Sequence, residues 1–253
     1  MRAFFLITRS VTGRLLGLRR SIGLFVLTGS IAPLLLVLAP GRSSEWMATF
    51  YNDITVGLGF SILFPVAALV VSTAALGEER KSHTLPFLLL KPVSRWAISL
   101  GVITAAALAS FVILGAGVIA SWTAAAVVTG DWSIGVSTAV AAAVQSVASA
   151  ALFVPLGLVV GRAAVAGLGY LLIWEVTLGN VIEGIQASSI YRIVVSAWAD
   201  LAALTPDNLE TVTEVLGRVE VGVGGAVAKA AALAIISVIV TGWLLKHRDL
   251  VPE

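Results

Sequence analysis

Six long stretches of this chain are apolar on every face, and most of its charged residues lie between them. Charged residues make up only 12% of the 253 residues, whereas a soluble domain has about 25%. Each stretch has the roughly 20 residues that a helix needs to cross a bilayer while satisfying its own backbone hydrogen bonds. The predicted fold class is therefore all-α, a single polytopic membrane domain over residues 1–253. The predicted spans are 22–39, 54–76, 97–122, 134–160, 163–182 and 223–245.

The distribution of charge predicts how these spans are oriented. Twelve basic and four acidic residues lie before the first span, in the loops after the second and fourth spans, and after the sixth. The opposite side, counted together with Glu175, has three basic and ten acidic residues. Because basic residues favour the cytoplasmic side, both termini are predicted to be cytoplasmic in a multi-pass protein of the plasma or inner membrane.

Two segments outside the spans also have helical patterns. Residues 1–21 contain five arginines and no acidic residue among apolar ones, which predicts a basic amphipathic helix on the membrane surface. The alternative is a signal-peptide n-region, with 22–39 as its h-region. Residues 183–221 are acidic, yet apolar residues recur at helical spacing from Ile190 to Leu204. We therefore expect short external helices there that dip into or lie on the outer leaflet.

The most distinctive segment is the charged island at 77–96, between the second and third predicted spans. We expect a helix over about 78–90 and, after Pro92, a second helix that continues into the third span. Its charged residues would face water and pair with a partner's charges, and its leucines would fill a groove. The alternative is an ordinary basic loop without a partner. The short motifs in this island are Glu79-Arg80, Thr84-Leu85, Leu88-Leu89 and Pro92-Val93-Ser94-Arg95.

These motifs, flanked by two spans, resemble the coupling loop of permease subunits in type-2 ABC transporters. The sequence departs from that pattern at His83, where glycine is common, and at Val102, where lysine is common. The resemblance implies an ATP-driven exporter with separate cytoplasmic ABC ATPase subunits, which bind ATP and Mg²⁺, and a second permease copy or a related permease. The residues implied to contact the ATPase are Glu78, Glu79, Arg80, Lys81, Thr84, Leu85, Leu88, Pro92 and Arg95.

Polar residues inside the spans form a second group of candidates. Glu175 lies about 18 Å into the fifth predicted span, and Lys229 lies about 9–12 Å into the sixth from the other side. Intramembrane charges normally pair or face a cavity, so we expect Glu175 and Lys229 to face each other or the translocation path. In the alternative, the helix breaks near Glu175 and both side chains reach the outer interface. Gln145, deep in the fourth span, is a further candidate for the path.

The sequence also excludes several classes of protein. It contains no cysteine and only two histidines, which argues against thiolate catalysis and against zinc or other metal sites. It has no nucleotide-binding loop and no hydrolase motif, so we expect no catalytic residue, no cofactor in this chain and no nucleic-acid partner. The expected partners are the ATPase, a permease and the lipid bilayer. Two alternative functions remain: a membrane anchor or sensor that does not transport, and an ion-coupled secondary transporter that uses Glu175.

Overall fold

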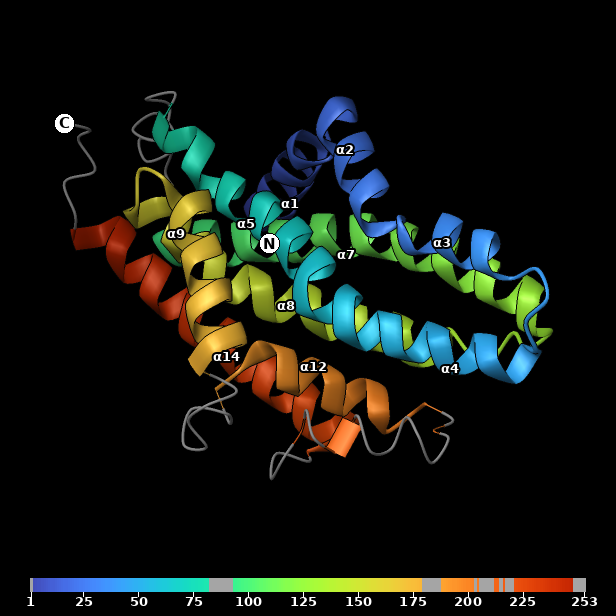
Figure 1. Ribbon diagram of the computed structural model, residues 1–253. Helices are drawn as coiled ribbons and strands as arrows, with labels where there is room; N and C mark the ends of the chain where they lie inside the picture. Colours follow the sequence, from blue (N-terminus) through green and yellow to red (C-terminus); the bar gives the residue numbers. More distant parts are fainter. Residues whose placement is uncertain are drawn as a thin grey trace.

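The structure is a computed structural model, and it describes residues 2–81, 93–178, 188–202, 204, 212–213, 216 and 221–247. All regular secondary structure in these ranges is helical, as predicted (Figure 1). The helices are α1 (Arg2–Leu15), α2 (Leu18–Thr28), α3 (Ile31–Leu38), α4 (Ser44–Ile54), η1 (Thr55–Leu63), α5 (Phe64–Lys81), α7 (Arg95–Thr129), α8 (Val136–Val159), α9 (Ala163–Tyr170), η2 (Leu171–Leu178), α12 (Ile190–Ala199) and α14 (Gly222–His247).

Five helices in the described residues are long and apolar enough to cross a membrane. They correspond to the first four and the last of the predicted spans. The fifth predicted span corresponds to a shorter apolar helix, Ala163–Glu175, which η2 extends to Leu178. The structure therefore supports a multi-pass helical membrane protein, while the count of six remains a prediction. The five helices are Leu18–Leu38, Ser44–Arg80, Arg95–Thr129, Val136–Val159 and Gly222–His247.

The second span is longer than predicted and is not a uniform α-helix. It begins ten residues earlier, at Ser44, because the Ser43 hydroxyl accepts a hydrogen bond from the Trp46 amide at 3.2 Å and caps the helix. Its middle, η1, is a π-helix of nine residues. π-Helical turns are rare, occur mostly as single-turn bulges within α-helices, and are frequent at functional sites. α4, η1 and α5 therefore form one long rod whose middle has a distinct geometry (Figure 1).

α8 lies at the centre of the bundle and packs against α5, α7, α12 and α14. Its buried face consists mainly of alanine and serine, which allow neighbouring helices to come close. Gly157 marks one such close approach, because an added Cβ there would lie 2.4 Å from the backbone oxygen of Thr73 in α5. The core therefore depends on small residues along α8.

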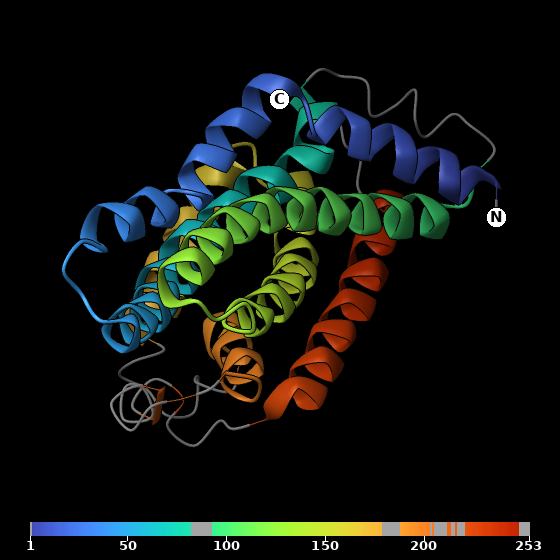
Figure 2. The same cartoon turned by 90° about the vertical axis from the view of Figure 1, so that its right-hand side faces the viewer.

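The two segments predicted outside the spans have more defined positions than expected. α1 ends at Leu15, and residues 18–21 are the start of α2 and of the candidate span Leu18–Leu38. The interfacial position of the N-terminal segment remains a prediction. α1 packs along α7, as Figure 2 shows, and also contacts α5. α12 lies within the segment predicted to form short external helices; it packs against α8, α14 and η1, and Trp198 within it is fully buried. Its position at the outer leaflet remains a prediction.

Candidate functional site

The first group of charged side chains lies at the basic end of the bundle, where α5 ends. Arg14 of α1 forms an ion pair with Glu79, and Arg20 of α2 forms one with Glu78. The Arg14 guanidinium also donates to the backbone oxygen of Ala75 at 3.0 Å. These side chains are only partly buried. The N-terminal helices are therefore attached to the end of α5 through charges that water still reaches.

α1 is also attached to α7, through two long hydrogen bonds and an apolar contact. The Thr8 hydroxyl donates to the Gly101 oxygen at 3.3 Å, and the Thr12 hydroxyl donates to the Ala105 oxygen at 3.5 Å. A Cβ on Gly101 would lie 3.0 Å from the Ile7 side chain, so glycine permits this close approach. α1 thus bridges α5 and α7, the two helices that flank residues 82–92.

The residues implied to contact an ATPase are distributed over both helices. Glu78, Glu79, Arg80 and Lys81 form the last turn of α5. Arg95 is the first residue of α7, which is capped by the hydroxyl of the preceding serine. The remaining candidates, Thr84, Leu85, Leu88 and Pro92, lie outside the described residues. The two glutamates, expected to await a partner's charges, have arginine partners within this chain, which the sequence analysis did not anticipate.

The second group surrounds the carboxylate of Glu175 in η2. One carboxylate oxygen accepts hydrogen bonds from the Ser189 hydroxyl at 2.5 Å and the Tyr191 amide at 3.2 Å. The other oxygen accepts from the Ile190 amide at 3.0 Å and the Tyr170 hydroxyl at 3.1 Å. Four donors therefore satisfy a side chain that is only 7% exposed, which is the condition for burying a carboxylate at acceptable cost.

This arrangement places a negative charge at the start of α12. The amides of Ile190 and Tyr191 belong to the first turn of that helix, where backbone N–H groups have no partner within the helix. Ser189 caps the same helix, because its hydroxyl also accepts from the Arg192 amide at 3.2 Å. Glu175 thus acts as a second cap, supplied by the preceding helix and favoured by the helix dipole.

Both π-helices of the described chain are hydrogen-bonded to the first residues of α12. Glu175 is part of η2, and the Tyr191 hydroxyl donates to the Val56 backbone oxygen in η1 at 3.3 Å. The start of α12 is therefore bonded to two helical segments of unusual geometry. Because π-helical turns recur at functional sites, this junction is a candidate functional site.

A small pocket lies between this junction and α8. Its volume is about 10 Å³, close to the minimum for one water molecule. Gln145 is 1% exposed; its amide nitrogen donates to the Ser149 hydroxyl at 2.8 Å, and its oxygen has no hydrogen-bond partner among the described residues. The structure thus brings the candidates Gln145 and Glu175 to one site. The lining residues are Ser61, Pro65, Gln145, Ser149, Phe153, Leu171, Glu175, Ile190 and Tyr191.

The structure does not bring Lys229 to this site. Lys229 is half-buried on α14, and the ion pairs of the described residues do not include one between Lys229 and Glu175. The Glu175 carboxylate bonds to the start of α12 instead, which was predicted neither by the pairing hypothesis nor by its alternative with both side chains at the outer interface. A sequence signal existed for part of this site, because a serine directly before an apolar helical run is a helix-capping signature.

The described residues contain no cluster of three or more histidine, aspartate or glutamate side chains that would hold a metal ion. No curated protein matches this sequence. One family model matches residues 16–175, more than half of the chain, and its description is "ABC-2 family transporter protein". The matched range begins just after α1 and ends at Glu175, so it includes the ion-paired end of α5, the start of α7 and Gln145.

Proposed function

The chain belongs to the ABC-2 transporter family, and we propose that it is the permease of an ATP-driven exporter whose separate cytoplasmic ATPase subunits hydrolyse ATP. Members of this family form the membrane component of a transporter and lack ATPase domains. In this chain, the membrane helices would form the translocation path, and the segment 77–96 would bind the ATPase. The direction of transport follows from the family resemblance.

One observation supports the coupling role of segment 77–96. The segment joins α5 and α7, and both helices continue without interruption into membrane spans. α1 is bonded to both of them near this segment. A force applied to the segment would therefore move two spans and the N-terminal helix together, because packed helices move as rigid bodies.

The ion pairs at this end suit an exchangeable contact. Pairs that water reaches contribute only about 0–1 kcal/mol, so Glu78 and Glu79 can leave Arg20 and Arg14 for basic residues of an ATPase at little cost. In that bound state the two arginines would be released from α5. This exchange would couple binding of the ATPase to a shift of the N-terminal helices.

Co-purification with the ATPase tests the proposal. We expect the complex to form with the wild-type chain, and we expect charge reversal by Glu79→Arg or Arg95→Glu to reduce both binding and ATP turnover by about tenfold. Arg42→Glu is the matched control, because Arg42 lies in an exposed loop at the other end of the bundle. Equal turnover for all variants, or transport by the purified chain alone with a proton gradient, would disprove this function.

We also propose that both termini are cytoplasmic and that two permease copies, or one copy and a related permease, enclose the path. Six helices rarely surround a conduit for a large solute, and the basic residues gather at the end with α1. Because the chain has no cysteine, single cysteines can be introduced near Arg14 and in the loop at Arg42. A membrane-impermeant maleimide applied to intact cells should label the second position and not the first.

A further inference from the structure

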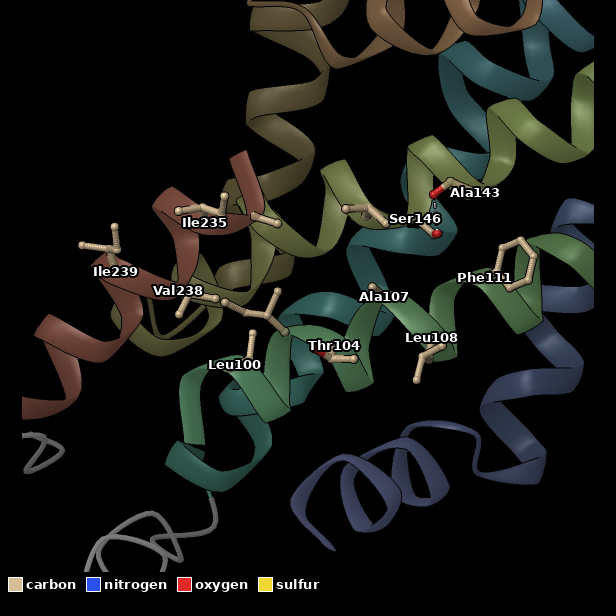
Figure 3. A pocket seen from close by; sticks show the side chains of 13 residues that line it. Leu100, Thr104, Ala107, Leu108, Phe111, Ala143, Ser146, Ile235, Val238 and Ile239 are labelled. Carbon is tan, nitrogen blue, oxygen red and sulfur yellow. Dashed lines mark hydrogen bonds between the residues drawn. The ribbon is translucent and has the colours of Figure 1, made fainter. Parts of the chain in front are cut away.

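An apolar cavity of about 550 Å³ lies between α7, α8 and α14, outside the polar junction described above (Figure 3). Its size is within the range of sites that bind small molecules. The residues that line it come from all three helices, as Figure 3 shows. They are Leu100, Ile103, Thr104, Ala107, Leu108, Phe111, Ala143, Ser146, Val147, Ala234, Ile235, Val238 and Ile239.

The walls offer almost no hydrogen-bonding capacity to an occupant. Only Thr104 and Ser146 have hydroxyl groups, and the Ser146 hydroxyl donates to the Ala143 backbone oxygen at 2.8 Å. Several lining side chains are also exposed at the outside of the bundle, including Leu108 and Ile235. The cavity is therefore a groove that opens sideways from three membrane helices, and a hydrocarbon chain matches its chemistry.

The groove follows the helices toward the basic end of the bundle. Along α7 it extends from Phe111 to Leu100, about 16 Å at helical rise. One turn further lies Trp96, which is half exposed and rests on Gly242 of α14, where an added Cβ would lie 2.7 Å from the indole ring. An indole at this position is typical of the membrane–water interface.

Basic side chains lie just beyond this indole. Lys246 is one turn after Gly242 on the same face of α14 and is exposed. His247 is also exposed and stacks on Trp243, with ring centroids 5.1 Å apart. Arg95 precedes Trp96 at the start of α7. Basic groups between membrane helices at the interface are suited to the phosphate of an anionic lipid.

We propose that this groove binds an anionic glycerophospholipid of the adjacent leaflet, with one acyl chain between α7, α8 and α14 and the phosphate near Lys246 and Arg95. The combination of an apolar groove and a basic mouth favours this occupant over a second copy of the chain. Two copies in one membrane have the same orientation, so a symmetric contact through this face would bring the basic ends together, and like charges in contact oppose association. The proposal shares Arg95 with the proposed ATPase contact, but lipid binding does not require the ATPase.

Native mass spectrometry of the purified full-length chain, after reconstitution with phosphatidylglycerol or phosphatidylcholine, tests the site. We expect one retained phosphatidylglycerol and no retained phosphatidylcholine. Ala107→Trp, which fills the groove from a partly exposed position, should abolish retention. Lys246→Gln, at an exposed position of α14, should weaken it about fivefold, since one basic residue near the surface contributes about 1 kcal/mol to anionic lipid binding.

Matched controls separate the site from general effects. Ile119→Trp adds the same side chain at an exposed position of α7 outside the groove, and Arg42→Gln removes a charge at the other end of the bundle; both should retain the lipid. Equal retention of phosphatidylcholine would overturn the proposal, as would retention that neither Ala107→Trp nor Lys246→Gln changes. A dimer that Ala107→Trp dissociates, with no lipid in either form, would assign the groove to a second copy and would equally overturn it.

Discussion

Glutamates occupy two opposite environments in this protein. At the end of α5, Glu78 and Glu79 pair with arginines from other helices in a place that water reaches. In η2, Glu175 is buried, and its carboxylate accepts hydrogen bonds from two backbone amides and two hydroxyl groups. The first environment uses full opposite charges, and the second uses neutral donors and the start of a helix.

The difference follows from the cost of removing charge from water. An exposed ion pair gains little because solvent screens it, so its members exchange partners easily. A buried carboxylate must keep every bond, because a lost donor or acceptor leaves an unpaired polar group in the apolar core. The basic end is thus suited to contacts that form and break, and the junction at Glu175 is suited to holding η1, η2 and α12 in one arrangement.

The largest effect is expected at the buried glutamate. Glu175→Ala should lower the free energy of unfolding by about 3–5 kcal/mol, since several donors are left unpaired at about 1–3 kcal/mol each. Glu175→Gln should cost less, because its amide oxygen still accepts from the start of α12. Thermal unfolding of the detergent-solubilised chain measures both. If Glu175→Ala has the same melting temperature as the wild type, the junction at Glu175 is not a rigid element. The buried glutamate would then contribute no more to stability than the ion pairs at the basic end.

The next effect is expected where α5 crosses α8, at the close contact between Thr73 and Gly157. Gly157→Ala should cost about 1–3 kcal/mol through overpacking, because the new Cβ would meet the backbone oxygen of Thr73, which cannot move aside as a side chain would. Gly161→Ala is the matched control, since nothing lies within 4 Å of a Cβ there. Equal melting temperatures for the two variants would mean that α5 and α8 separate easily at this crossing.

A smaller effect is expected at the ion-paired end. A double-mutant cycle with Arg14→Ala and Glu79→Ala should give a coupling free energy of about 0.5–1 kcal/mol, and this coupling should shrink as salt is added. Denaturant unfolding at low and high ionic strength provides the measurement. A coupling free energy of several kcal/mol that does not change with salt would mean that this ion pair is shielded from water, as Glu175 is. That result would argue against an exchangeable contact.

The smallest effect lies in the exposed loop between α7 and α8. Hydrogen bonds from the Ser133 hydroxyl and amide, at 2.7 and 2.8 Å, hold the pKa of Asp131 below its usual value. Stability from this lowered pKa is present above the unfolded-state pKa and is lost as the pH falls through the folded-state pKa. Carboxyl titration by NMR should show Ser133→Ala raising the pKa of Asp131, and an unchanged pKa would contradict these hydrogen bonds.

Much of what characterises the basic end could be predicted from the sequence, but little of the hydrogen bonding at the buried junction could. The motifs around Glu79 and Arg95 indicated a transporter family, which the family match then confirmed, because charged residues between apolar runs stand out by composition alone. The partners of Glu79 were not predicted, since Arg14 is 65 positions away and their contact depends on how α1 packs. Gln145 and Glu175 were recognised as unusual, but their common pocket depends on the packing of α8, η2 and α12.

The sequence by itself determined that this chain is a helical membrane protein, because several apolar runs of about 20 residues match the thickness of a bilayer, and a helix satisfies its own backbone hydrogen bonds there. It also determined which end of the bundle is basic, since charge is a local property of each loop. Only the tertiary structure decided that Glu175 caps α12 while Lys229 stays apart, and that α1 bridges α5 and α7. Such contacts join residues from separate helices, and their geometry depends on small residues, such as Gly157, that set how closely the helices approach.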